Sequence, residues 1–171
     1  MRTHQYFPLI YVLVLICQVF LSNYTNLGPY VMLTMLPAMI LCIPTSVSTI
    51  TCMLIAFASG FATDWLAEGI LGLNVAALIP VAALRKGLIR IFLGEDIIAR
   101  NDSFSIRKNG LGKVTLALLT ASAIFLAIYI FLDGAGTRPF WFCSIKFGVS
   151  LFLNWALGLL VINTLTIDDR R

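Results

Sequence analysis

Long apolar runs, separated only by short polar breaks, fill most of this 171-residue sequence. The run "FPLIYVLVLICQVF" near the start and the whole stretch 114–132 contain no charged residue. A water-soluble domain of this length has too little interior for so much apolar surface. Only 12% of its residues are charged, against about 25% in an ordinary soluble domain. We therefore expect an all-α integral membrane protein, with the bilayer as its solvent.

Six candidate transmembrane helices follow from these runs, at about residues 6–21, 30–44, 47–65, 71–84, 114–132 and 140–165. Several are shorter than the ~20 residues that cross a bilayer upright, so spans two to four are expected to form closely packed hairpins. The alternative is one long helix in place of spans two and three, which Pro44 and the Ser/Thr cluster after it disfavour. The first run lacks a small-residue cleavage site and is expected to be retained. Residues 1–171 are thus predicted to form a single polytopic domain.

The basic residues give this predicted topology an orientation. With the N-terminus in the cytoplasm, ten of the twelve Lys and Arg residues fall inside, most of them in the connection 85–113. Of the remaining two, Arg138 falls in an outer loop and Lys146 within the last span, whereas the outer connection 65–70 is acidic. This distribution agrees with the positive-inside rule and predicts that both termini are cytoplasmic.

The connection 85–113 is the only sizeable polar segment. Its first half alternates apolar pairs with charges, a pattern typical of an amphipathic helix at the inner membrane surface. Its cations are expected to anchor to anionic lipid headgroups, and a docking surface for a cytoplasmic partner is the alternative. Nucleic acid is not an expected partner, because most of the chain never meets water.

The stretch "ASGFATDWLAEGILGLN" places the first two acidic residues of the chain beside three glycines. On a helix, one stripe would hold every fourth residue: Cys52, Ala56, Gly60, Asp64 and Glu68. The small members would allow a neighbouring helix to approach closely. Gly69 and Gly72 suit a tight turn in which Asn74 could hydrogen-bond, and Glu68 is expected to face water.

Asp64 needs a partner or a function at such a place in a membrane protein. Lys146 lies at a comparable depth in span six, so we hypothesise an Asp64–Lys146 ion pair. The alternative is that Lys146 extends outward while Asp64 caps its own helix end or a backbone turn. Asn154, also in span six, is a candidate for an interhelical hydrogen bond.

Catalytic and metal-binding motifs are absent from the sequence. There is one histidine, His4, and no Ser/His/Asp set, metal-binding cluster, Walker motif or dinucleotide fingerprint. The four cysteines have no CxxC spacing and lie in apolar runs, as small buried thiols do. We expect a protein that is not an enzyme and needs no cofactor or metal.

Two passages resemble the bacterial rod shape-determining MreD family, in particular its versions from the Bacteroidetes group. In "QVFLSNYTNLGPYVMLTMLPAMIL" the first span ends in Gln18 and is followed by a polar turn and an apolar second span. The passage "FASGFATDWLAEGILGLNVAALIPVAALRKGLIR" is similar to the family pattern G-x-x-x-D, then G-x-x-G-x-(H/N)-x-x-A, then an Arg that ends span four. The matching positions are Gly60, Asp64, Gly69, Gly72, Asn74, Ala77 and Arg85.

The resemblance implies a non-enzymatic inner-membrane component of the cell-elongation machinery, which helps to regulate peptidoglycan synthesis and cell shape. Its implied partners are the bitopic protein MreC and, through it, MreB, RodA and a penicillin-binding protein. The implied fold resembles the substrate-binding subunits of energy-coupling-factor vitamin transporters. A small-molecule-binding subunit of such a transporter is therefore the alternative function. The transporter needs a small-xxx-small motif in span one, and span one here is bulky throughout.

Overall fold

The computed structural model describes residues 7–24, 30–94, 104, 109–134 and 138–165, with the side chain of Glu68 left out. All of the regular elements in these ranges are helices. The elements are α1 (Phe7–Tyr24), α2 (Leu36–Cys42), α3 (Thr49–Thr63), the π-helical turn η1 (Asp64–Glu68), α4 (Leu73–Leu93), α7 (Leu111–Gly134) and α8 (Phe140–Leu165). The expectation of an all-α chain is confirmed for the described residues.

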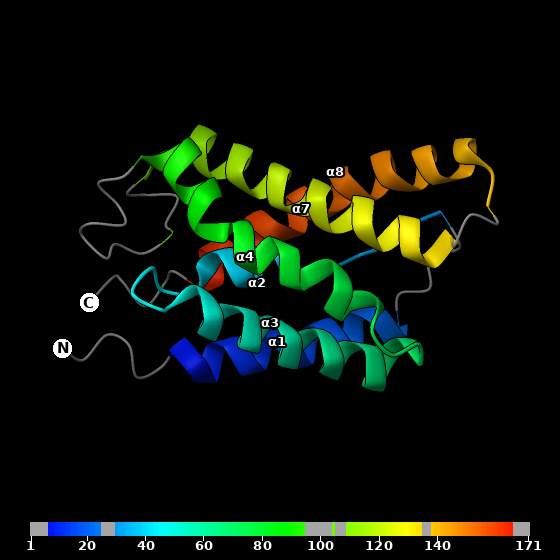
Figure 1. Cartoon of the computed structure of the whole chain (residues 1–171), viewed down its shortest axis with the longest axis horizontal. Coiled ribbons are helices and arrows are strands. Elements are labelled where there is room, and N and C mark those ends of the chain that lie inside the picture. Colours follow the sequence, from blue (N-terminus) through cyan, green and yellow to red (C-terminus); the bar gives the residue numbers. More distant parts are fainter. Residues whose placement is uncertain (1–6, 25–29, 95–103, 105–108, 135–137, 166–171) are drawn as a thin grey trace.

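The long helices form an elongated bundle in which α4 and α2 lie between two pairs (Figure 1). On one side α7 packs against α8, and on the other α3 and α1 lie side by side. α4 contacts both α3 and α7, so it joins the two sides. The turn between α3 and α4 and the start of α8 lie at one end of the bundle, which we call the Asp64 end (Figure 1). The last turns of α4 and the first turn of α7 lie at the opposite end.

α2 is the central element of the bundle. Its sequence LPAMILC is apolar on every side, and every one of its seven residues is buried. A helix that is apolar all round has no face for water and is stable only when it is surrounded. It contacts α1, α3, α4, α7 and α8. Pro37 begins the helix where no amide hydrogen is needed, and Pro44 follows its end.

Four helical segments are long and apolar enough to cross a membrane: Phe7–Tyr24, Thr49–Ala67, Leu111–Gly134 and Phe140–Leu165. They correspond to the predicted spans one, three, five and six, and the bounds of the last are as predicted. The helical prediction for span two, 30–44, is wrong over its first half, because the helix covers only Leu36–Cys42. Ile43, Pro44 and the Ser48 N-cap separate α2 from α3, so the single long helix weighed as an alternative is also excluded.

The helix that corresponds to span four does not stop at residue 84, the predicted end of that span. α4 continues through Pro80 and Arg85 to Leu93 before Gly94, with a φ of 99°, ends it. The expected amphipathic pattern does occur in this extension: Leu88, Ile89 and Leu93 are buried in the bundle core, whereas Ile91 is 75% exposed. Most of the apolar face therefore packs on the protein itself. The rest of the connection is largely outside the described residues, as are Arg2, His4 and the C-terminal tail.

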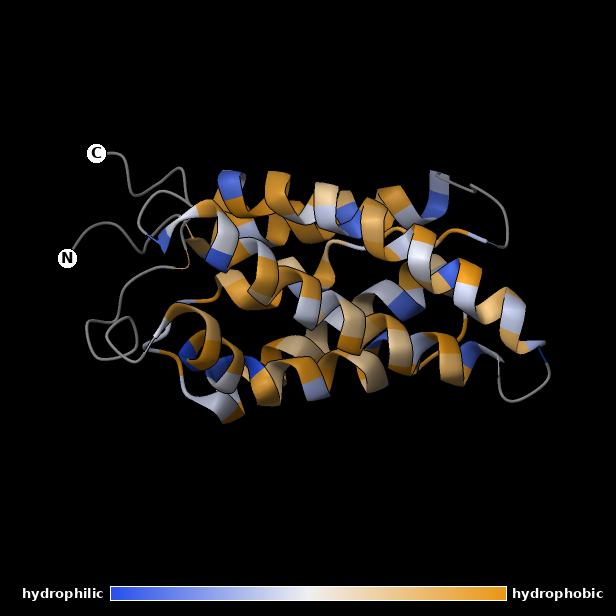
Figure 2. Ribbon diagram, turned by 90° about the horizontal axis from the view of Figure 1, so that it is seen from above, coloured by the Kyte–Doolittle hydropathy of each residue, from blue (hydrophilic) through white to orange (hydrophobic). Residues whose placement is uncertain are grey.

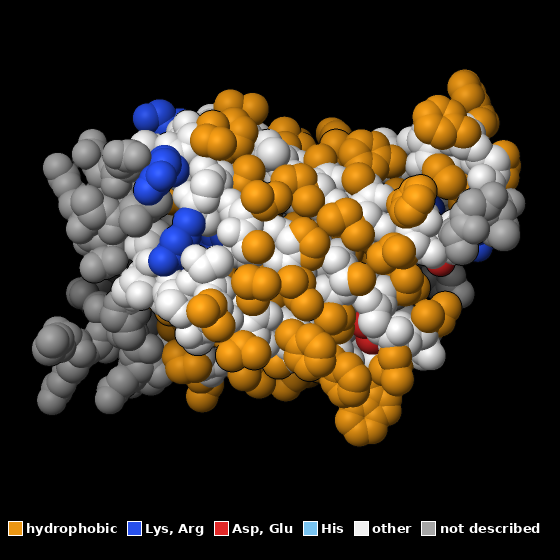
Figure 3. All heavy atoms as spheres, in the orientation of Figure 1, with side chains coloured by type: hydrophobic (Ala, Val, Ile, Leu, Met, Phe, Trp, Pro, Cys, Tyr) orange, Lys and Arg blue, Asp and Glu red, His pale blue; other side chains and the backbone are white. Residues whose placement is uncertain are grey.

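The outer surface of the bundle carries a broad apolar belt. Space-filling spheres show hydrophobic side chains over the middle of the visible face, with Lys and Arg gathered at the end opposite Asp64 (Figure 3). Ribbons coloured by hydropathy show the same dominance of apolar residues along the helices (Figure 2). Large side chains such as Leu9, Phe131 and Phe152 are mostly exposed. A belt of this kind is what a bilayer solvates, and the chain is a membrane protein by this measure.

Candidate functional site

The predicted stripe on α3 is a single buried face. Cys52, Ala56, Gly60 and Asp64 are all buried, as their four-residue spacing predicts. At its end α3 widens into the π-helical turn η1, in which the Gly69 amide donates to the Asp64 carbonyl oxygen at 2.8 Å. Gly69 has a φ of 70° and Gly72 a φ of 102°. Both values are costly for other residues, so the two glycines permit the reversal into α4.

The carboxylate of Asp64 holds the first turn of α4 and is completely buried. Oδ2 accepts from the Gly72 amide at 2.9 Å and from the Val75 amide at 3.4 Å. Oδ1 accepts from the Asn74 amide at 3.0 Å and from Asn74 Nδ2 at 2.9 Å. The first amides of a helix have no partner within it, and their dipoles favour a negative charge. Asp64 is therefore an N-cap for α4 supplied by another helix.

Gly60 makes the close approach of these two helices possible. A Cβ atom on Gly60 would lie 2.9 Å from the Val75 nitrogen and 3.0 Å from the Val75 Cα. Those atoms belong to the backbone of the α4 turn that Asp64 caps, so they cannot rotate away. We call Gly60, Asp64, Gly69, Gly72 and Asn74 the Asp64 joint. Five of the predicted site residues thus form one structural unit.

Lys146 is not part of this joint, so the hypothesis of an Asp64–Lys146 pair is wrong. Lys146 Nζ lies 2.8 Å from Asp133 Oδ2, which links α8 to the end of α7. The ammonium group also lies 5.8 Å from the centre of the Tyr129 ring. α7 is the direct neighbour of α8 and supplies the carboxylate that pairs with Lys146. The alternative for Asp64, a cap on a backbone turn, is confirmed.

Arg85 lies in the bundle core, just past the middle of α4. It is 1% exposed, and its Nη2 donates to the carbonyl oxygen of Ile43, the residue that ends α2. Carbonyl groups at a helix C-terminus have no partner within the helix and attract a cation. Arg85 therefore caps the C-terminal end of α2, as Asp64 caps the N-terminal end of α4. About 16 Å of helix separates Arg85 from Asn74, given a rise of 1.5 Å per residue.

A second cluster, which the sequence analysis did not assemble, holds the non-helical segment 31–35. On α8, Ser150 Oγ accepts from the Met32 amide at 2.9 Å and Asn154 Oδ1 accepts from the Thr34 amide at 2.8 Å. On α1, Gln18 Oε1 accepts from the Met35 amide at 2.7 Å. Backbone amides inside a membrane protein need such partners. Asn154 does form a predicted buried hydrogen bond, although its partner is a backbone amide outside any helix.

The sequence did contain a signal for this cluster. Lys146, Ser150, Asn154 and Gly158 recur every four residues in α8, and all four are buried. Two residues of extended chain span about 6.6 Å, and four residues of helix span about 6 Å. The amides of Met32 and Thr34, two residues apart, can therefore reach Ser150 and Asn154, which are four residues apart on one face of α8. The segment that they bind lies far away in the sequence, so spacing alone did not identify it.

The chemistry available in these clusters is that of structural hydrogen bonding. Among the described residues, no group of three or more His, Cys, Asp or Glu side chains is placed to hold a metal ion. All four cysteines are free thiols, and Cys42 and Cys52 are buried as expected, whereas Cys17 is exposed and Cys143 is only partly buried. Both oxygens of Asp64 are engaged by donors from the same chain. The Asp64 joint is consequently a point of assembly between α3 and α4.

Comparisons with protein-family models, with curated proteins and with solved structures find no match to this chain.

Proposed function

We propose that this protein is a non-enzymatic component of the bacterial cell-elongation machinery, similar to MreD, in the inner membrane. The proposal rests on the G-x-x-x-D and G-x-x-G-x-N pattern that the sequence shares with that family. What supports it is that Gly60, Asp64, Gly69, Gly72 and Asn74 meet in one joint, with every acceptor position of Asp64 directed at α4. Such a motif fixes how two helices pack on each other. A scaffold protein depends on this kind of packing more than on a reactive group.

The same proposal includes six membrane crossings, a fold like that of the substrate-binding subunits of energy-coupling-factor transporters, and both termini in the cytoplasm. Residues 31–34 as extended chain would cover about 13 Å, and Met35, whose backbone is helical, together with the seven residues of α2 covers about 12 Å. Together they give about 25 Å of the ~30 Å of a hydrocarbon core. α4, with 21 residues, is long enough at about 31 Å. Lys86 and Arg90 lie in the second half of α4 and Lys113 in the first turn of α7, so these cations gather at one end of the bundle and support an inside location for that end.

The described residues give less support to the alternative function, a vitamin-transporter subunit. Such a subunit needs close helix docking through small residues in its first helix, and the exposed side of α1 carries Leu9, Leu13, Ile16 and Phe20. Bulky side chains keep a partner backbone at a distance. The cavities at α7–α8 and at α1–α3 are lined mainly by apolar residues, without the convergent polar groups that bind a vitamin.

A bitopic MreC-type protein is the partner that we propose, with MreB, RodA and a penicillin-binding protein reached through it. Gly60 and Asp64 are buried against α4, so they are not available to a partner. The exposed apolar residues of the same turn are Trp65, Leu66, Ile70 and Leu71. These are 58–68% exposed and provide the contact surface that a transmembrane or membrane-proximal helix would cover.

Affinity purification from native membranes tests this assignment. The tagged chain is expected to retain an MreC-type bitopic protein, identified by mass spectrometry. Ile70→Ser should reduce that retention severalfold without lowering the thermal stability of the purified chain. Ile91→Ser, at the opposite end of α4 and 75% exposed, is the matched control. Retention of a coupling ATPase in place of the bitopic protein would contradict the proposal.

A further inference from the structure

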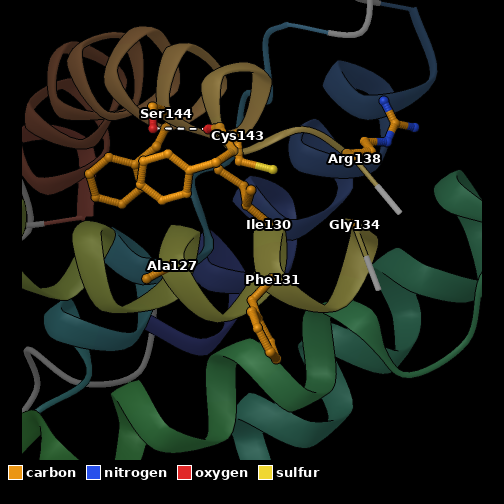
Figure 4. A pocket seen from close by; sticks show the side chains of 9 residues that line it. Ala127, Ile130, Phe131, Gly134, Arg138, Cys143 and Ser144 are labelled. Atoms are coloured by element: carbon orange, nitrogen blue, oxygen red, sulfur yellow. Dashed lines mark hydrogen bonds between the residues drawn. The ribbon is translucent and has the colours of Figure 1, made fainter. Parts of the chain in front are cut away.

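The outer halves of α7 and α8, toward the Asp64 end, enclose a groove that none of the preceding clusters uses. Its volume is about 430 Å³, within the range of ligand pockets. α7 contributes Ala127, Ile130, Phe131 and Gly134, and α8 contributes Phe140, Cys143, Ser144 and Phe147. Figure 4 shows these side chains around the space between the two helices, with the Cys143 thiol pointing into it.

The groove lies along the bilayer-facing side of the bundle and opens sideways. The rings of Phe131 and Phe140, which line it, are 78% and 87% exposed. Ser144 adds little polarity, because its hydroxyl donates to the Phe140 carbonyl oxygen at 3.0 Å. The interior is therefore suited to a hydrocarbon.

One cation lies at the mouth of this apolar groove. Arg138 precedes α8, is exposed and lines the groove at its edge (Figure 4). Its guanidinium carbon lies 5.0 Å from the centre of the Phe142 ring, which leaves the N–H groups at the ring edge free to reach outward. Among the described side chains, Lys146 and Asp133 pair with each other at 2.8 Å. The described part of the mouth therefore carries the positive charge of Arg138 beside an apolar slot.

We propose that this groove binds an acyl chain of an anionic phospholipid, with Arg138 on its phosphate. Arginine matches phosphate geometry with paired hydrogen bonds. A partner helix is a poorer fit, because a 10 Å length of helix about 10 Å wide occupies roughly 800 Å³. The two helices also stay close at the base of the groove, where a Cβ on Gly134 would lie 3.9 Å from the Cys143 sulfur.

Native mass spectrometry of the detergent-purified full chain, titrated with phosphatidylglycerol or with phosphatidylcholine of the same acyl chains, tests this site. We expect phosphatidylglycerol to bind about tenfold more tightly, and Arg138→Gln to remove that preference. Ala127→Trp, which fills the groove from an exposed position, should weaken both lipids. Lys113→Gln and Ala156→Trp, exposed and outside the groove, are the matched controls and should change neither affinity.

The rate of Cys143 alkylation by N-ethylmaleimide locates the bound lipid. In a Cys17→Ser background, which removes the exposed thiol, phosphatidylglycerol should slow the reaction severalfold, and Ala127→Trp should abolish that protection. Equal affinities for the two lipids, unchanged binding in Arg138→Gln, or an unchanged alkylation rate would each overturn the proposal. So would a second copy of the chain that occupies the groove, detected as a dimer lost in Ala127→Trp.

Discussion

Asp64 is a buried carboxylate whose two oxygens both accept hydrogen bonds from donors of the same chain. Its two oxygens accept from the backbone amides of Gly72, Asn74 and Val75 and from the side-chain amide of Asn74, at 2.9–3.4 Å. An isolated charge at this depth would be very costly, whereas a helix N-terminus offers both donors and a favourable dipole. The residue that looked misplaced in an apolar sequence is thus the cap of the next helix.

Replacing Asp64 should destabilise the chain in a graded order. Asp64→Asn retains one acceptor oxygen and should cost less than Asp64→Ala, which leaves several buried donors without partners. We expect Asp64→Ala to cost roughly 2–4 kcal/mol, since one unsatisfied buried donor costs about 1–3 kcal/mol. Thermal unfolding in detergent measures the order. Equal midpoints for the wild type, Asp64→Asn and Asp64→Ala would contradict the cap.

A charge exchange tests the partner of Lys146. Lys146→Asp places two carboxylates side by side and should lower the unfolding midpoint, because like charges at this depth repel. Adding Asp133→Lys should recover most of that loss, whereas adding Asp64→Lys should not. Recovery through Asp64→Lys would show that the ion pair observed at 2.8 Å is not the one that stabilises the protein.

The helices of this chain are only partly predictable from its sequence. Apolar length and charge located α1, α3, α7 and α8, because these helices satisfy their own backbone and need only a bilayer around them. Segment 31–35 was not predicted, because its amides bind side chains of Gln18, Ser150 and Asn154 from helices distant in sequence. The length of α4 was underestimated because Arg85, a typical surface residue, closes α2 within the core.

The packing of α3 on α4 depends on the missing side chain at position 60. Gly60→Ala should cost about 1–3 kcal/mol through overpacking, because the added methyl group would lie 2.9 Å from the Val75 nitrogen. Gly87→Ala is the matched control, a helical glycine with nothing within 4 Å of its Cβ position. The control should be neutral or slightly stabilising. Equal effects of the two substitutions on the unfolding midpoint would refute the close contact.

The anchoring of segment 31–35 by α8 predicts coupled substitutions. Ser150→Ala and Asn154→Leu each remove an acceptor, and each should cost about 0.6–2 kcal/mol, as membrane hydrogen bonds do. Because both acceptors hold the same segment, the double variant should cost less than the sum. Thr120→Ala is the control, since its exposed hydroxyl bonds only to Leu116 of its own helix. Additive losses would indicate that the two contacts act independently.

At the scale of the whole molecule, the described chain is a belt of apolar helices around the buried α2. Two internal caps hold it together, with Asp64 on the start of α4 and Arg85 on the end of α2. Both positions belong to the motif that resembles the MreD family. The shared motif indicates that Asp64 and Arg85 have related roles. Which helix each residue caps follows only from the arrangement of the bundle. In the described residues these hydrogen bonds hold helices together, as the proposed scaffold role requires.

The most direct test of the proposed role is the shape of cells depleted of this protein. Microscopy at intervals after depletion is expected to show rod-shaped cells that widen and become round before growth stops, and expression of the wild-type chain should restore their width. Cells that keep their width and length throughout depletion, but grow only when a vitamin is supplied, would contradict the cell-elongation role.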